Sequence, residues 1–153
     1  MPVNDMTLKI AGEAGQGVES SGAGFAQALA RGGLHIFAMQ DYMSRIRGGH
    51  NFFQIRVAPH DIHSQTDKIH LLLAMNKQAI AEHRTEMAEG GGVIYDQGLK
   101  VEAKELEDEG IRAFSSPLVE IAEEVGGHRV MVNTAAIAVA TGIRATVSRR
   151  SLR

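Results

Sequence analysis

The apolar residues of this chain fall into short runs that predict β-strands. Residues 6–11 and 35–39 are each short and mostly apolar. Residues 69–75 are apolar almost without interruption, which is typical of a parallel strand buried on both faces of a sheet. Residues 93–96 and 111–114 are two further short candidates. The order of these runs, with helical patterns between them, indicates an α/β protein.

Residues 51–57 differ from the other runs because polar and apolar positions alternate. The alternation predicts a strand with one face toward a core and one open face. The side chains expected on the open face are Phe52, Gln54 and Arg56.

Helical periodicity joins the strands. A first helix is expected over residues 18–30, and a second follows Asn76, the expected N-cap residue, and ends at glycines 90–92. A third is expected to begin at residues 116–117, because proline is tolerated in the first helical turn. The charge-rich stretch 100–109 is expected to be a solvated loop or a peripheral hairpin.

The C-terminal region divides into an apolar segment and a basic tail. Residues 135–141 are apolar nearly all round, so we expect a partner or further chain to cover them. We expect one three-layer, Rossmann-like α/β domain with a mostly parallel sheet over residues 1–142. The tail 143–153 is expected to be disordered or a shortened end. Because the chain opens β-α-β, its first glycine turn is expected at the carboxyl end of a parallel sheet, where ligands bind.

Composition excludes several classes of function. Lys plus Arg number 16 against 18 for Asp plus Glu, and this net charge of -2 disfavours nucleic acid and anionic membranes as partners. There is no cysteine, so this chain has no thiolate for an iron–sulfur cluster, a zinc site or a nucleophile. No leader pattern or membrane-spanning apolar stretch is visible, so we expect the cytoplasm.

The glycine turn Gly12-Glu13-Ala14-Gly15-Gln16-Gly17 is the first candidate site. Glycines let the backbone approach a ligand, and the N–H groups of a following helix attract an anion. The spacing matches neither the dinucleotide fingerprint nor a Walker loop, so a turn that serves packing alone is the alternative. The candidate cofactor-binding residues are Gly12, Gly15, Gln16 and Gly17.

A second candidate is the polar connection that ends in Arg45, Arg47, Gly48 and Gly49. Guanidinium groups bind phosphate or carboxylate with two parallel hydrogen bonds, and the glycine pair allows close approach. The alternative is a pair of solvated arginines before a hairpin turn.

Histidine positions favour neither a metal site nor a catalytic base. His60 and His63 lie in a loop that fixes no shared face, so a polar surface turn is the preferred interpretation. His83 lies on the apolar side of its predicted helix and is expected at the edge of the core. We therefore predict no catalytic and no metal-binding residue.

Together, the two glycine motifs resemble the gamma subunit or gamma domain of 2-oxoacid:ferredoxin oxidoreductases, a family that includes the pyruvate and 2-oxoglutarate enzymes. Residues 12–17 look like its glycine-rich turn, and residues 42–51, Tyr-Met-Ser-Arg-Ile-Arg-Gly-Gly-His-Asn, look like its R-G-G segment before a strand. The second motif is most similar to the form fused to the N-terminus of the alpha subunit. The resemblance covers roughly residues 5–142, and the chain looks like an isolated or shortened gamma domain.

The resemblance implies oxidative decarboxylation of pyruvate or 2-oxoglutarate to acyl-CoA, with ferredoxin as electron acceptor. Thiamine diphosphate, magnesium and iron–sulfur clusters are then expected in alpha and beta partner subunits, and this chain contributes assembly, gating or contact with coenzyme A. Glu13 departs from the small residues of many members, and its carboxylate repels an anion unless it turns outward. The alternatives are an independent NAD- or FAD-binding oxidoreductase domain, which lacks the usual acidic residue at the end of its second strand, and a noncatalytic scaffold.

Overall fold

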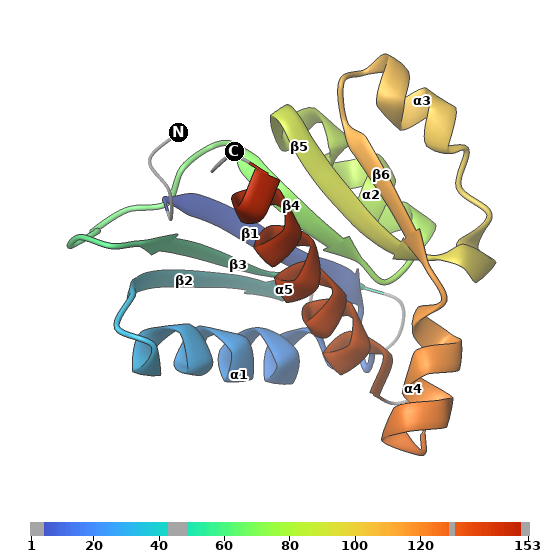
Figure 1. Ribbon diagram of the computed structural model, residues 1–153, viewed down its shortest axis with the longest axis horizontal. Helices are drawn as coiled ribbons and strands as arrows, with labels where there is room; N and C mark the ends of the chain where they lie inside the picture. Colours follow the sequence, from blue (N-terminus) through green and yellow to red (C-terminus); the bar gives the residue numbers. More distant parts are fainter. Residues whose placement is uncertain (1–4, 43–48, 129–130, 151–153) are drawn as a thin grey trace.

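The computed structural model describes residues 5–42, 49–128 and 131–150. Within these ranges a six-stranded sheet has the order β2-β3-β1-β4-β5-β6 (Figure 1). β3 pairs antiparallel with both β1 and β2, whereas β1, β4, β5 and β6 pair in parallel. The strands are β1 (Met6–Glu13), β2 (His35–Tyr42), β3 (His50–Ala58), β4 (Ile69–Ala74), β5 (Met87–Asp96) and β6 (Arg112–Ser116). The expected mostly parallel α/β sheet is confirmed.

Helices cover both faces of the sheet and make three layers. One core cluster joins the sheet to α1 (Val18–Arg31), α4 (Leu118–Gly126) and α5 (Val132–Arg150), and Figure 1 shows α5 crossing in front of the strands. The other cluster joins the opposite face to α2 (Lys77–His83) and α3 (Ala103–Asp108). In the central strand β4, Leu73 belongs to the first cluster and Leu72 to the second. This placement explains why β4 has no polar face.

The chain leaves β1, crosses through α1 and returns as β2, which is not the neighbour of β1. β3 folds back after β2 and lies between them, pairing with β1 over eight residues and with β2 over eight. The opening β-α-β unit is therefore present, with an antiparallel strand inserted in its middle. The carboxyl ends of β1 and β2 consequently lie at the same edge of the sheet, one strand apart.

Close packing of α1 on the sheet occurs at Gly22. A Cβ at Gly22 would overlap the ring of Phe53, whereas a Cβ at Gly24 would meet open space.

The open face predicted for β3 is wrong at Gln54. Its side chain is only 5% exposed, and its Nε2 donates to Gln65 Oε1 at 3.2 Å and to the Thr66 carbonyl at 3.3 Å. The loop between β3 and β4 thus covers this part of the strand, a long-range contact that alternation cannot report.

Two expectations between residues 77 and 109 are also wrong. The second helix ends at His83, followed by a short 3-10 turn, η1 (Arg84–Glu86), and glycines 90–92 lie inside β5. A Cβ at Gly92 would overlap the ring of Phe114, so glycine here serves strand packing. The charge-rich stretch contains α3, because one residue, Leu106, is 3% exposed and anchors it to the core.

The final helix was expected to end before Gly142 and to need a partner as cover. Instead α5 continues to Arg150, since a single glycine costs a helix only about 1 kcal/mol. Ala136 and Ala140 are 1% and 3% exposed against the sheet, which supplies the cover. The division of the chain at residue 142 stays a prediction. No helix in the described residues is long and apolar enough to cross a membrane.

Candidate functional site

The turn between β1 and α1 requires its glycines for backbone reasons. Gly15 and Gly17 have φ values of 90° and 72°, in the left-handed region that favours glycine. A Cβ at Gly12 would overlap the side chains of Gln16 and Met75. The turn therefore needs all three glycines, and their contact with a ligand stays a prediction.

Gly17 is the N-cap residue of α1, and within the described residues no side-chain hydrogen bond caps the helix. Its carbonyl accepts hydrogen bonds from Ser21 N at 3.0 Å, Ser21 Oγ at 2.6 Å, Ser20 Oγ at 3.2 Å and Asn133 Nδ2 at 3.3 Å. The donors fix the peptide from one side, and Asn133 ties the start of α5 to the turn. The positive end of the α1 dipole is left directed at the space beyond the turn.

One further hydrogen bond closes the turn, and another brings the two sequence motifs together. Gln16 Oε1 accepts from the Glu13 amide at 2.7 Å, which closes the turn internally. Ala14 N donates to the Gly49 carbonyl at 3.2 Å. Gly49 is buried and immediately precedes β3, so the second motif directly supports the first.

A pocket of about 280 Å³ opens beside the turn. Its walls are the turn, the start of α1, the ends of β2 and the beginning of β3. The lining residues are Glu13, Ala14, Gly15, Gly17, Val18, Glu19, Ser20, Gln40, Asp41, Tyr42, Asn51, Phe52 and Phe53. The pocket lies at the carboxyl ends of β1 and β2, the edge where α/β sheets bind ligands.

The described wall of the pocket is acidic. Glu13, Glu19 and Asp41 are exposed carboxylates, and no Lys or Arg is among the described lining residues. The Tyr42 hydroxyl donates to Glu19, and this hydrogen bond to a carboxylate raises the pKa of Tyr42. An anionic ligand therefore requires cations from outside the described wall, and Glu13 at the rim reinforces this need.

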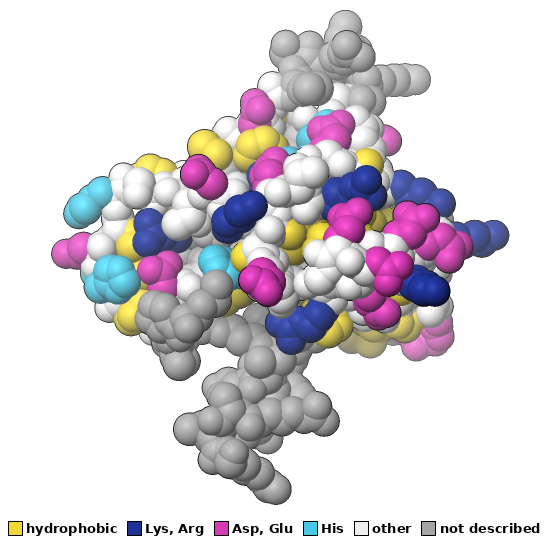
Figure 2. Space-filling view, turned by 90° about the horizontal axis from the view of Figure 1, so that it is seen from above, with side chains coloured by type: hydrophobic (Ala, Val, Ile, Leu, Met, Phe, Trp, Pro, Cys, Tyr) yellow, Lys and Arg dark blue, Asp and Glu magenta, His cyan; other side chains and the backbone are white. Residues whose placement is uncertain are grey.

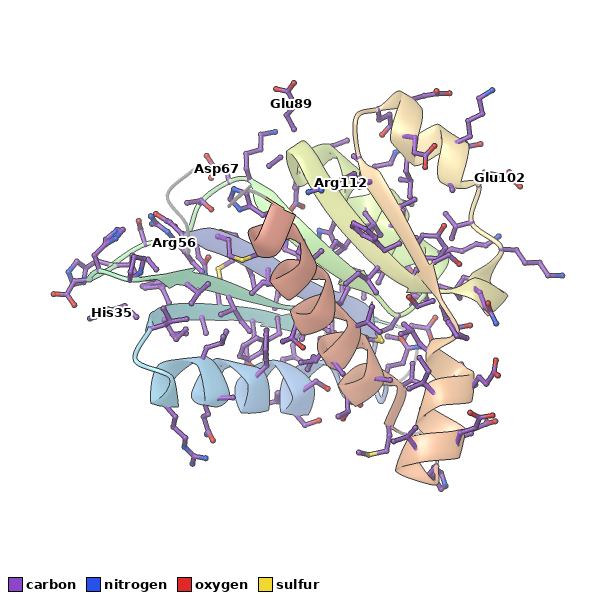
Figure 3. The ribbon with its side chains drawn as sticks, in the orientation of Figure 1. His35, Arg56, Asp67, Glu89, Glu102 and Arg112 are labelled. Atoms are coloured by element: carbon purple, nitrogen blue, oxygen red, sulfur yellow. The ribbon has the colours of Figure 1, made fainter. Side chains whose placement is uncertain are left out.

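Arg45, Arg47 and Gly48 lie outside the described residues, in the segment that joins β2 to β3. Arg56 and Arg112, both labelled in Figure 3, lie near the opposite end of the strands. Arg56 is paired with Asp5 at 3.2 Å, and Arg112 donates to the Gly90 carbonyl at 3.0 Å. Neither arginine can therefore supply a cation to the pocket. On the face of the molecule that Figure 2 presents, acidic and basic side chains are interspersed.

Sequence reasoning missed two groups that support the site. Asn133, at the start of α5, donates through Nδ2 to the Gly17 carbonyl. His83 was expected at the core edge, and it is 4% exposed in a polar network with Lys9, His50 and Glu86. The contacts of Asn133 with Gly17 and of His83 with Lys9 and His50 join residues 33 to 116 positions apart, so no local pattern indicates them. Among the described residues no group of three or more His, Cys, Asp or Glu has the arrangement of a metal site.

Comparisons with known proteins agree on one family. The family model described as pyruvate ferredoxin/flavodoxin oxidoreductase matches residues 7–153. The 2-oxoglutarate synthase subunit KorC of Methanothermobacter thermautotrophicus is 30% identical over 150 residues, which cover 94% of this chain and 79% of that protein. The chain spans less than a third of several longer relatives, among them alpha subunits.

Solved structures give the same result. The 2-oxoglutarate:ferredoxin oxidoreductase of Magnetococcus marinus, with 2-oxoglutarate, coenzyme A and succinyl-CoA bound, matches with a TM-score of 0.75 and 29% identity over 85% of this chain and 23% of that one. The gamma subunit of a keto/oxoacid ferredoxin oxidoreductase from Geobacter sulfurreducens shares the fold, with a TM-score of 0.65 and 22% identity over 84% of this chain and 70% of that one. With its two glycine motifs joined at one pocket and nearly its whole length matched, the chain belongs to the pyruvate ferredoxin/flavodoxin oxidoreductase family.

Proposed function

We propose that this chain is the gamma-type unit of a 2-oxoacid:ferredoxin oxidoreductase, in which pyruvate or 2-oxoglutarate is oxidatively decarboxylated to acyl-CoA and ferredoxin accepts the electrons. Its relatives are subunits of such oxidoreductases. The chain has no cysteine for an iron–sulfur cluster. Thiamine diphosphate, magnesium and the clusters are therefore assigned to alpha and beta partner subunits, through which ferredoxin would also be reached.

The observation that carries the proposal is the pocket at the glycine turn, which we infer contacts coenzyme A. A related structure that matches 85% of this chain holds coenzyme A. The uncapped start of α1 offers N–H groups and a positive dipole end, which suit the phosphate groups of that cofactor. A volume of about 280 Å³ is at the small end for ligand sites, so the pocket would take only part of the molecule.

Arg45 and Arg47 are proposed as the cations that the acidic wall needs. The segment that carries them begins after Tyr42, a lining residue, and ends before Gly49, which accepts from the turn. Arginine binds phosphate oxygens with two parallel hydrogen bonds and keeps its charge at any working pH. Gly12, Gly15, Gln16, Gly17, Gly48 and Gly49 complete the proposed contact set.

The competing function, an independent NAD- or FAD-binding domain, is disfavoured by the sheet order. In dinucleotide-binding domains the first two strands are adjacent and parallel, and the ribose is held by an acidic residue at the end of the second. Here Asp41 does lie near the end of β2, which is longer than expected, but the antiparallel β3 separates β2 from β1. The relatives support the first function and not this one.

Calorimetric titration of the purified chain with coenzyme A tests the proposal. Arg47→Ala should raise the Kd about tenfold, since losing one charge-assisted hydrogen bond costs about 1.5 kcal/mol. Arg112→Ala is the matched control, because it removes an arginine at the far end of the sheet, and it should leave the Kd unchanged. Equal Kd values for both variants, or binding of NAD tighter than that of coenzyme A, would overturn the assignment.

A further inference from the structure

A buried chain of polar groups lies on the α2 side of the sheet, behind the pocket. Lys9 of β1 is 3% exposed, and its Nζ donates to Glu86 Oε2 at 2.5 Å. Glu86 Oε1 lies 3.0 Å from His83 Nδ1, and His83 Nε2 lies 2.8 Å from His50 Nε2. His50 and His83 are 5% and 4% exposed. The four residues come from β1, β3, α2 and η1, so the chain of contacts links elements that sequence separates.

The contacts specify where the protons lie. His50 Nδ1 is buried and has no hydrogen-bond partner among the described residues. An unprotonated Nδ1 at this position therefore costs less free energy than an unpaired N–H group. His50 therefore carries its proton on Nε2 and donates it to His83 Nε2. His83 then carries its own proton on Nδ1 and donates it to the Glu86 carboxylate. One proton lies between the two Nε2 atoms, and it belongs to His50.

The surroundings oppose a second proton on the pair. A proton on His83 Nε2 would set two N–H groups against each other at 2.8 Å, with Lys9 Nζ only 3.3 Å from His83 Nδ1. A proton on His50 Nδ1 would be a buried donor without an acceptor. Glu82 of α2, at 3.6 Å from His50 Nε2, and Glu86 are the anions that face the pair. Burial lowers the pKa of His83, and the Lys9 charge lowers it further, against the opposing effect of Glu86.

The pair is connected to the pocket through the backbone. His50 is the first residue of β3, and the preceding residue, Gly49, supplies the carbonyl that accepts from Ala14 N in the glycine turn. Glu13, which begins the turn, is the direct strand partner of His50. Fixing the His50 ring therefore fixes the carbonyl that supports the turn.

We propose that His83 and Glu86 are positioning residues for the ligand pocket and that they act through His50. The single proton between the two imidazoles holds the start of β3 in place. It thereby also holds the Gly49 carbonyl against the glycine turn. Protonation of His83 Nε2, with His50 keeping its own proton on Nε2, replaces this hydrogen bond by two opposed N–H groups and loosens the turn. The statement that the loosened pocket binds coenzyme A less well rests on the proposed function; the effect on the turn does not.

The proton itself is tested first by nuclear magnetic resonance of the full chain with ¹⁵N-labelled histidine. A scalar coupling between the two Nε2 nuclei is expected at pH 7.5 and should disappear on acidification. In the same samples the protection of the Ala14 amide against exchange, corrected for the intrinsic rate at each pH, should fall about tenfold once the coupling is lost, as expected for one lost hydrogen bond. Absence of the coupling at pH 7.5, or an Ala14 exchange rate that does not follow it, would overturn the proposal.

Two substitutions at His83 separate positioning from mere packing. In His83→Gln the side-chain oxygen can still accept from His50 Nε2 but does not titrate, so Ala14 protection should become independent of pH between 7.5 and 5 after correction for intrinsic exchange. In His83→Met the acceptor is absent, so exchange at Ala14 should be about tenfold faster at every pH. His63→Gln, at an exposed histidine, is the control and should behave as the parent chain. Equal pH profiles for His83→Gln and the parent would contradict the mechanism.

Coenzyme A titrations of the same variants connect the turn to the ligand. If the pocket binds coenzyme A, the Kd of the parent should rise about tenfold from pH 7.5 to 5, and that of His83→Gln should change much less. A parent chain that does not bind coenzyme A at any pH would reject the ligand assignment but leave the Ala14 result to decide the positioning role. Binding with the same pH dependence in both proteins would reject the role of His83.

Discussion

Gly17 is the residue on which the candidate site depends most. Its φ of 72° disfavours any other residue, and a Cβ would overlap Asn133 Nδ2. We expect Gly17→Ala to lower the free energy of unfolding by about 2 kcal/mol. Gly24→Ala makes the same change on an exposed position of α1 with open space around it, and it should raise the free energy by about 0.5 to 1 kcal/mol. Urea denaturation measures both, and a Gly17→Ala protein as stable as the control would contradict this account of the turn.

At the residue scale, the sequence could predict the glycines of the turn but not the hydrogen bonds that hold the turn in place. The spacing of Gly12, Gly15 and Gly17 indicates a tight turn before a helix, because the conformational freedom of glycine is a local property. The hydrogen bonds from Asn133 and to Gly49 are made across 116 and 35 positions. Such contacts follow from the assembled sheet, so they could not be read from the motif itself.

At the scale of elements, β1 and β4 are joined by a side chain as well as by their ladder. His70 Nδ1 of β4 accepts from the Thr7 amide of β1 at 2.9 Å, which requires an unprotonated Nδ1. Burial holds the pKa of His70 below its usual value, against a smaller opposing effect of Asp5. The neutral form is therefore favoured by folding. The stabilisation that the neutral His70 ring contributes to the folded state is complete above the unfolded pKa of about 6.5. It is lost as pH falls through the folded pKa.

The expected result is a free energy of unfolding that falls by about 1 kcal/mol more in the parent than in His70→Asn when pH drops from 7.5 to 5. Asparagine offers an oxygen near the position of Nδ1 and does not titrate, so it keeps the contact with Thr7. His63→Asn is the exposed control and should follow the parent. His83 contributes in the same direction in all three proteins, so only the difference between them is informative. Parallel curves for His70→Asn and the parent would refute the role of His70.

Element boundaries show where local patterns stop being sufficient. The buried run 69–75 and the N-cap Asn76, whose Oδ1 accepts from Ala79 N at 2.8 Å, agree with the sequence prediction. The glycines 90–92 were interpreted as a helix end, yet they lie inside β5, where Gly92 allows the strand to pack against Phe114. Glycine suits both a left-handed cap and a crowded strand, and only the neighbouring strand distinguishes them.

At the scale of the whole molecule, apolar surface remains where helices do not cover the sheet. β2 is an edge strand, and among its residues Met39 and Tyr42 are 43% and 51% exposed. We expected the exposed apolar surface on residues 135–141, but α5 packs its own apolar face onto the sheet. The mostly parallel architecture was predictable because its central strand is apolar at every position except His70. The insertion of β3 between β1 and β2 was not, since pairing order depends on the whole sheet.

The last prediction is that the purified chain alone catalyses no 2-oxoacid oxidation. Electron transfer to ferredoxin needs a redox centre, and a chain without cysteine has no thiolate ligands for an iron–sulfur cluster. Mixtures with candidate alpha and beta subunits should reduce ferredoxin or viologen when pyruvate or 2-oxoglutarate and coenzyme A are present. Omitting this chain should lower that rate, and adding Gly24→Ala should restore it whereas Gly17→Ala should not. Turnover by the isolated chain would show that the chemistry resides here rather than in partner subunits.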